Sequence, residues 1–104
     1  MAVFEMNGNG GGAEIKRVTG SFTWTDASMT LTVSGLSDIK FIYFDDTIST
    51  YEVMAFVDDD DTMHFTWDDR ARYPAVNVIS AINGNVISMS GGRGRVFDYI
   101  AFGY

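Results

Sequence analysis

Apolar and polar residues alternate with a period of two along much of the chain, which is typical of β-strands that are buried on one face. The clearest example is residues 29–33, where methionine, leucine and valine alternate with two threonines. Within residues 14–24, Val18, Phe22 and Trp24 fall on one face, and polar residues fall on the other. No segment combines a 3.6-residue apolar period with helix-capping residues. The sequence therefore predicts an all-β fold.

A run of aspartates, Asp58–Asp61, predicts the turn of a first β-hairpin between strands 51–57 and 62–67. A turn centred between the middle two aspartates gives a register that pairs Phe56 with Met63 and Met54 with Phe65. One face of the hairpin then carries Met54, Phe56, Met63, Phe65 and Trp67. The other face carries Val53, Ala55, Thr62, His64 and Thr66, with His64 opposite Ala55.

A second hairpin is predicted by Asn83-Gly84, a pair that is among the strongest short-range turn signals. This turn pairs Val78 with Met89 and Ala81 with Val86. Further strands are predicted over residues 3–6, 39–44 and 96–102, and residues 39–44 are apolar on both faces, as in a central strand. About eight or nine short antiparallel strands in a chain of this size indicate an antiparallel β-sandwich of the jelly-roll kind.

The chain has 104 residues, which leaves room for one core. Residues 1–12 are predicted to form a short strand and a glycine-rich tether, and residues 13–104 the β-sandwich domain. Because glycine-rich segments are flexible, an apolar strand on this tether is suited to pairing with the sheet edge of a neighbouring subunit. Val3 and Phe4 are the expected anchoring side chains of this oligomer arm.

The formal net charge of −7 argues against partners that attract basic proteins. Neither nucleic acid nor an anionic membrane surface is expected, because both bind clusters of lysine and arginine. The chain has no cysteine, so it offers no thiolate nucleophile and no sulfur-ligated metal site. Its N-terminus lacks the basic and apolar regions of a signal peptide, and we expect synthesis in the cytoplasm.

No candidate for catalysis gains support from its neighbours in the sequence. His64 is the one histidine, and the predicted register places it on an outward face. Asp58–Asp61 is expected to be a solvated turn, with a bound calcium ion as the alternative. Residues 8–13 match a dinucleotide-binding pattern by letter, but the segment that follows is a predicted strand instead of a helix. We therefore expect no enzymatic activity, no cofactor and no metal.

Aromatic residues are more numerous than one small core requires, with eight phenylalanines, five tyrosines and two tryptophans. Such side chains stack on sugar rings and also anchor protein interfaces. The alternative is that most of them lie in the core. The candidate ligand or interface aromatics are Trp24, Tyr43, Tyr51, Trp67, Tyr73, Tyr99 and Tyr104.

Three stretches share features with one group of proteins. The chain opens with MAVFEMNGNGGGAEI, a short strand and a glycine run. Residues 18–44, VTGSFTWTDASMTLTVSGLSDIKFIYF, combine a Thr-Gly-Ser strand, a threonine-rich strand and a Ser-Gly-Leu turn before an apolar strand. The chain ends with FDYIAFGY, which has a Tyr-x-Ala-x-Gly spacing. Together these stretches resemble small β-sandwich structural proteins of tailed bacteriophages, found in tail-fibre, baseplate and neck regions.

This resemblance implies a non-enzymatic structural or adhesion module of the virion. Virion proteins are symmetric oligomers, so other virion subunits are the implied partners and a homotrimer is the first expectation for a fibre-like location. A host-surface glycan is a further possible partner. The alternative function, from a different class, is a carbohydrate-binding module that uses exposed aromatic side chains.

Overall fold

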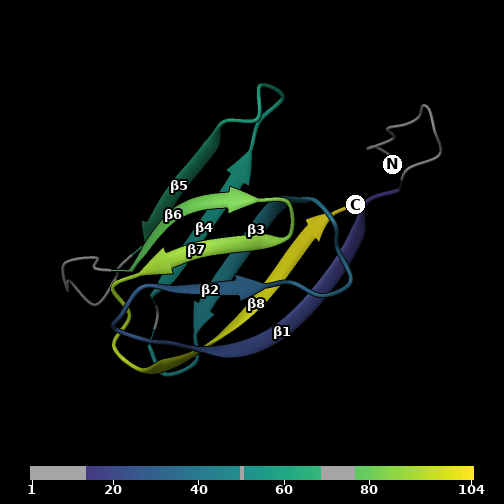
Figure 1. Ribbon diagram of the computed structural model, residues 1–104. Helices are drawn as coiled ribbons and strands as arrows, with labels where there is room; N and C mark the ends of the chain where they lie inside the picture. Colours follow the sequence, from purple (N-terminus) through teal and green to yellow (C-terminus); the bar gives the residue numbers. More distant parts are fainter. Residues whose placement is uncertain (1–13, 50, 69–76) are drawn as a thin grey trace.

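The computed structural model describes residues 14–49, 51–68 and 77–104, with the side chains of Trp67 and Asp68 excepted. This part of the chain forms eight strands and no helix (Figure 1), so the predicted all-β fold is confirmed. The strands are β1 (Lys16–Trp24), β2 (Met29–Thr32), β3 (Ile39–Asp46), β4 (Glu52–Val57), β5 (Met63–Asp68), β6 (Val78–Asn83), β7 (Val86–Ser90) and β8 (Arg95–Gly103). The predicted arm at residues 1–12, with Val3 and Phe4, lies outside the described residues.

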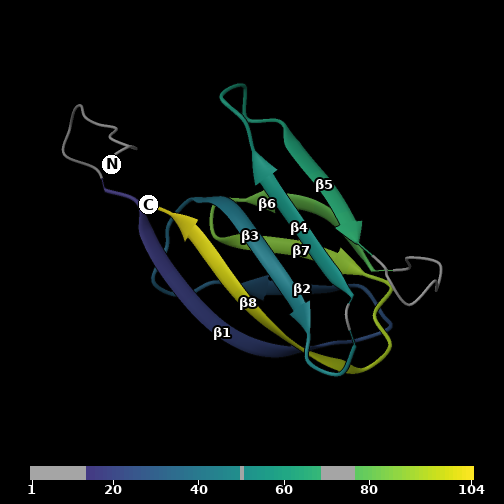
Figure 2. The same cartoon turned by 180° about the vertical axis from the view of Figure 1, so that it is seen from behind.

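The strands form two antiparallel sheets. The larger sheet has the order β1-β8-β3-β4-β5, and the smaller has the order β2-β7-β6. Figure 1 shows the smaller sheet lying across one face of the larger, and Figure 2 shows the larger sheet from its other side. This arrangement is consistent with a β-sandwich. β3 is the central strand of its sheet, as its two apolar faces predict.

The core fills the space between the sheets with alternate residues of each strand, as the period-two pattern requires. Its centre is aromatic. The ring of Trp24 lies 5.2 Å from that of Phe44 and 5.1 Å from that of Phe97, measured between centroids, and its Nε1 donates to the Ser90 carbonyl (3.0 Å). The buried hydrophobic residues are Trp24, Val33, Leu36, Ile39, Ile42, Phe44, Tyr51, Val53, Ala55, Ile79, Ile87, Met89, Phe97, Tyr99 and Ala101.

Gly20 interrupts the apolar face of β1 because the ring of Tyr99 occupies the position of a side chain. The two residues are direct cross-strand partners in β1 and β8. A Cβ atom added at Gly20 would lie 2.6 Å from the Tyr99 ring, well inside van der Waals contact. The Thr-Gly-Ser strand and the C-terminal Tyr-x-Ala-x-Gly segment, two of the stretches noted above, therefore contact each other directly.

The predicted register of the first hairpin is wrong by one residue. In the structure Ala55 pairs with Phe65 and Phe56 pairs with His64. A shift of one residue reverses the face of every side chain on one strand relative to the other. Val53 and Ala55 are consequently buried, whereas Met54 and Phe56 point away from the core, opposite to the predicted arrangement.

The length of the aspartate turn explains this error. The N–H of Asp58 donates to the carbonyl of Thr62 (3.0 Å), and the N–H of Asp61 donates to the carbonyl of Asp58 (3.0 Å). Asp61 has a positive φ of 61°. This is a three-residue loop in which a turn is followed by one left-handed residue, and its odd length shifts the register relative to the expected two-residue turn.

The second hairpin also differs from its predicted register. Asn83 pairs with Val86, so the two loop residues are Gly84 and Asn85 instead of Asn83 and Gly84. Gly84 has a φ of 63°, which glycine adopts readily at the first loop position. Ala81 therefore pairs with Ser88 and not with Val86. An irregularity between residues 79 and 81 then places Val78 opposite Ser90 instead of Met89.

Candidate interaction surface

The face of the larger sheet that points away from the smaller one carries side chains in three parallel rows, each crossing β8, β3 and β4. The register alone builds these rows. We call the first two rows together the apolar band: Phe102, Phe41 and Phe56, then Ile100, Tyr43 and Met54. We call the third row the acidic row: Asp98, Asp45 and Glu52. Figure 2 looks onto this face, and no described strand lies over it.

The apolar band is only partly shielded by its own packing. Phe41 and Phe102 lie with ring centroids 6.0 Å apart, and the ring of Phe56 stacks on that of His64 at 4.7 Å. Phe56 is still 46% exposed, and Val96, which lies on the same face but beyond the acidic row, is 43% exposed. The other five members of the band are half-buried. A band of adjacent, partly exposed apolar side chains is typical of an interaction site.

The acidic row sets like charges opposite each other on neighbouring strands, which is an unfavourable cross-strand arrangement. Partial burial raises the pKa of Asp45, and the charges of Glu52, Asp98 and Asp46 raise it further. The hydroxyl of Tyr43 donates to Glu52 Oε2 (2.8 Å), and that of Ser21 donates to Asp98 Oδ1 (2.6 Å). The ion pairs that Lys40, His64 and Arg95 form all use carboxylates outside the acidic row.

His64 is exposed on the outer face, as predicted, but it lies opposite Phe56 and not opposite Ala55. Its Nε2 lies 2.8 Å from Asp58 Oδ2. That carboxylate also accepts hydrogen bonds from the backbone N–H groups of Asp60 and Thr62, both to Oδ1 at 2.9 Å. These contacts lower the pKa of Asp58, and the hydrogen bond from His64 has the largest effect. Asp58 therefore shapes the turn and holds His64.

The predicted aromatic residues divide into buried, half-buried and undescribed. Trp24, Tyr51 and Tyr99 are buried in the core, so the interpretation of these three as surface aromatics is corrected. They face inward because they continue the alternation of inward-facing residues: Trp24 in β1, Tyr99 in β8, and Tyr51 just before β4, two residues from the buried Val53. Tyr43 and Tyr104 are half-buried, and only Tyr43 belongs to the apolar band. The side chain of Trp67 and the whole of Tyr73 lie outside the described residues.

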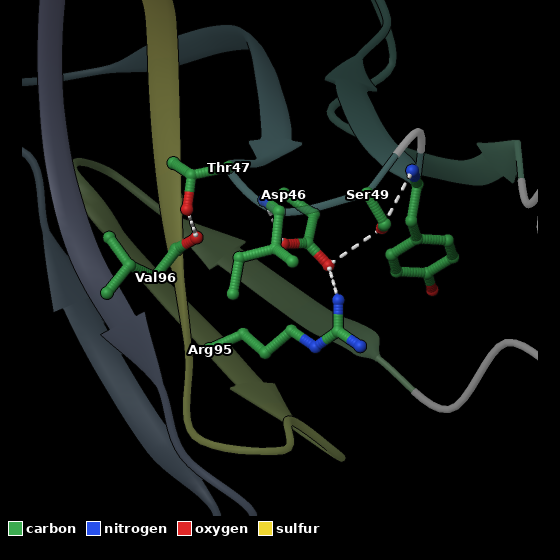
Figure 3. A network of polar contacts seen from close by, with 7 residues as sticks. Asp46, Thr47, Ser49, Arg95 and Val96 are labelled. Carbon is green, nitrogen blue, oxygen red and sulfur yellow. Dashed lines mark hydrogen bonds and ion pairs between the residues drawn. The ribbon is translucent and has the colours of Figure 1, made fainter.

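A second polar cluster lies at the end of the sandwich where β3 ends and β8 begins (Figure 3). Asp46 is a buried carboxylate, and its Oδ2 accepts from Arg95 Nη1 (2.8 Å) and from the Ser49 hydroxyl (3.0 Å). Its Oδ1 accepts from the N–H of Ile48 (3.0 Å). The Thr47 hydroxyl donates to the carbonyl of residue 96 (2.9 Å). Two of these contacts are internal to the 46–51 loop and two join it to β8, so the cluster anchors the loop to the body.

Residues 14–49, 51–68 and 77–104 contain no cluster with metal-binding geometry. No group of three or more histidine, aspartate or glutamate side chains in these ranges is arranged to hold a metal ion. None of the described elements is a helix long and apolar enough to cross a membrane. Comparison with known proteins returned no matching family model, no matching curated protein and no matching solved structure.

Sequence reasoning missed most of the apolar band and all of the acidic row. Phe41 lies in a segment that was expected to be buried on both faces, and Phe56 was assigned to the wrong face. A usable signal did exist in the last strand, where Ile100 and Phe102 alternate with the core residues Tyr99 and Ala101. The acidic row carried no local signal, because its three carboxylates come from three separate strands.

Proposed function

We propose that this chain is a non-enzymatic structural or adhesion module of a tailed-phage particle, and that it acts through contacts with other virion subunits. The observation that carries this proposal is the apolar band, which stands on an open sheet face. The resemblance of three sequence stretches to phage β-sandwich proteins supplies the virion setting. Burying such a band against another protein removes apolar surface from water, which is the main driving force for association.

Self-association is proposed to use the N-terminal arm, residues 1–12. β1 and β5 are the edge strands of the larger sheet, and β2 and β6 are those of the smaller. Edge strands offer unpaired backbone groups that an added strand from a neighbour can satisfy. In the sequence, the arm precedes β1. A homotrimer is the first expectation, with Val3 and Phe4 as anchors.

Deletion of residues 1–12 tests this proposal. Light scattering after size-exclusion chromatography should give an oligomeric mass for the full chain and a smaller mass for the truncated chain at low micromolar concentration. Circular dichroism should show that the truncated chain keeps its β-sheet spectrum. A full-length chain that is monomeric, or a truncated chain that keeps the full oligomeric mass, would count against self-association through the arm.

A carbohydrate-binding function is the second candidate, and one observation favours it. Tyr43 is half-buried and donates a hydrogen bond to Glu52 in the acidic row, and carboxylates next to an aromatic ring can accept hydrogen bonds from sugar hydroxyls. Burial of Trp24, Tyr51 and Tyr99 removes three of the other candidate rings. A glycan array separates the two functions: specific glycan binding that is lost in Tyr43→Ala supports the second, and binding to no glycan supports the first.

A further inference from the structure

We infer that the open face of the larger sheet docks a protein surface that is both apolar and positively charged, and that this partner is not a second copy of the chain. The inference deepens the proposed function and rests on it for the virion setting. It is drawn from the position of the acidic row directly beside the apolar band, on the same three strands. Neither feature alone specifies a partner, but the two together do.

Among the described residues, the ion pairs of Lys40, His64 and Arg95 all use carboxylates outside the acidic row. Arg95 is engaged with Asp46, at the other surface of the sheet, and Lys40 lies 3.4 Å from Asp38. Tyr43 and Ser21 donate hydrogen bonds to the row but bring no charge. The partial burial of Asp45 makes this charge harder to screen with solvent. Cations on a partner would offset the repulsion.

The geometry of the row also limits what can lie on it. Neighbouring strands are about 4.8 Å apart, so Asp98, Asp45 and Glu52 present three carboxylates at roughly that spacing along a line across the strands. The two rows of the apolar band run parallel to this line. On β3 they lie two residues (Tyr43) and four residues (Phe41) from Asp45. A complementary surface therefore has an apolar stripe with a row of lysine or arginine side chains along one side.

A second copy of the chain fits this face poorly. With a two-fold axis parallel to the strands and passing through β3, Asp45 would face its own copy and Asp98 would face Glu52. With the axis across the strands at the level of Tyr43, the acidic row would lie on the phenylalanine row of the other copy. The first arrangement adds like-charge repulsion, and the second desolvates carboxylates against rings without a cation.

The test uses the full chain and a synthetic helical peptide with a leucine stripe flanked on one side by lysines. Titration calorimetry should detect binding of this peptide, and a peptide with glutamates in place of the lysines should bind at least about tenfold more weakly. Amide chemical shifts should change mainly in β3, β4 and β8. Equal binding of the two peptides, or shift changes centred elsewhere, would overturn the inference.

A matched pair of triple variants separates the acidic row from the overall negative charge. Asp45→Asn/Glu52→Gln/Asp98→Asn removes three charges and keeps an oxygen acceptor for Tyr43 and Ser21. Asp26→Asn/Asp59→Asn/Asp60→Asn removes three charges from exposed turns. The first variant should lower affinity for the lysine peptide about tenfold or more, and the second by much less. Equal losses would mean non-specific attraction and would overturn the inference.

The self-association of the first triple variant gives an independent measurement. Without the charge of the acidic row, the apolar band of one copy no longer meets repulsion from another. Sedimentation velocity should therefore show stronger self-association for this variant than for the original chain, and unchanged association would contradict the inference. Arm deletion leaves this face intact, so failure of the arm experiment and failure of the peptide experiment are distinguishable outcomes.

Discussion

Two loops of this molecule begin with an aspartate that performs similar chemistry in different surroundings. Asp46 opens the 46–51 loop between β3 and β4, and Asp58 opens the 58–62 turn between β4 and β5. Each carboxylate accepts at least one backbone N–H from its own loop. Each also lies 2.8 Å from a cationic or ionisable nitrogen, on Arg95 for the first and on His64 for the second.

Burial separates the two loops. The side chain of Asp46 is 4% exposed, whereas that of Asp58 is 34% exposed. A buried carboxylate that loses its partners leaves uncompensated polar groups in a medium of low dielectric constant, while water replaces the partners of an exposed one. The same set of hydrogen bonds is therefore expected to matter for folding in the first loop and mainly for local turn shape in the second.

The largest expected effect is that of Asp46→Ala. The change removes the buried acceptor of three part-buried hydrogen bonds, from Arg95, the Ser49 hydroxyl and the Ile48 N–H. We expect a loss of about 2–3 kcal/mol in the free energy of unfolding, toward the lower end because Arg95 retains access to water. Urea denaturation followed by tryptophan fluorescence measures it. Asp58→Ala is the matched control, and an equal or larger loss in that variant would break the comparison.

A pair of double-mutant cycles sharpens the contrast further. Asp46→Asn combined with Arg95→Met should give a coupling energy of about 1–2 kcal/mol, because Arg95→Met alone leaves a buried charge unpaired. Asp58→Asn combined with His64→Gln should give a smaller coupling, since both of its members are solvated. Denaturation of the four single and two double variants provides both values. A larger coupling at the exposed pair would refute the role assigned to burial.

The pH dependence of stability should reveal the exposed loop instead. The pKa of Asp58 is lower in the folded chain than its ordinary value of 3.8. Its stabilising contribution is therefore complete above that value and is lost as the pH falls through the lower folded value. Asp58→Asn keeps the oxygen acceptor and removes the charge, so its stability should fall less steeply below about pH 4. Identical acid profiles would exclude this contribution.

The strands were predictable because the period-two pattern is local. Met29 and Leu31, for example, mark β2 without any information from its neighbours. The register of the β4–β5 hairpin was not predictable in the same way. It depends on which aspartate adopts a left-handed conformation, and four identical residues give no signal that Asp61 is that residue. The resulting error of one residue moved Phe56 from the surface to the expected core.

The candidate surface was harder to predict than the fold, because it is a product of long-range pairing. Asp45 and Glu52 are close in sequence, but Asp98 reaches them only because β8 inserts between β1 and β3. Three carboxylates in separate strands look like ordinary solvated charges when each is considered alone. The aromatic composition misled in the opposite direction. The number of aromatic residues predicted exposed ligand or interface rings, yet Trp24 and Tyr99 belong to the core.

The smallest expected effect concerns the backbone of the exposed loop. Asp61 has a φ of 61°. Glycine adopts this left-handed region without strain, and asparagine and aspartate are strained there, although less than other residues. Asp61→Gly should relieve this strain and the repulsion from neighbouring aspartates, which outweighs the greater freedom of glycine in the unfolded chain. The contact of Asp61 with Lys40, at 3.9 Å, is exposed and contributes little.

A gain of about 0.5 kcal/mol, or roughly 2–4 °C in melting temperature, is therefore expected for Asp61→Gly. Asp59→Gly is the control, because its φ is not positive and glycine there should only destabilise the fold. Asp59→Asn/Asp60→Gly, which favours a two-residue turn, should give no comparable gain, since the β4–β5 register requires a three-residue loop. If Asp59→Asn/Asp60→Gly is stabilised more than Asp61→Gly, the loop prefers the shorter turn. Calorimetric melting of the three variants measures these differences. A gain for Asp61→Gly alone would show that backbone conformation, and not carboxylate burial, limits the stability of the 58–62 turn.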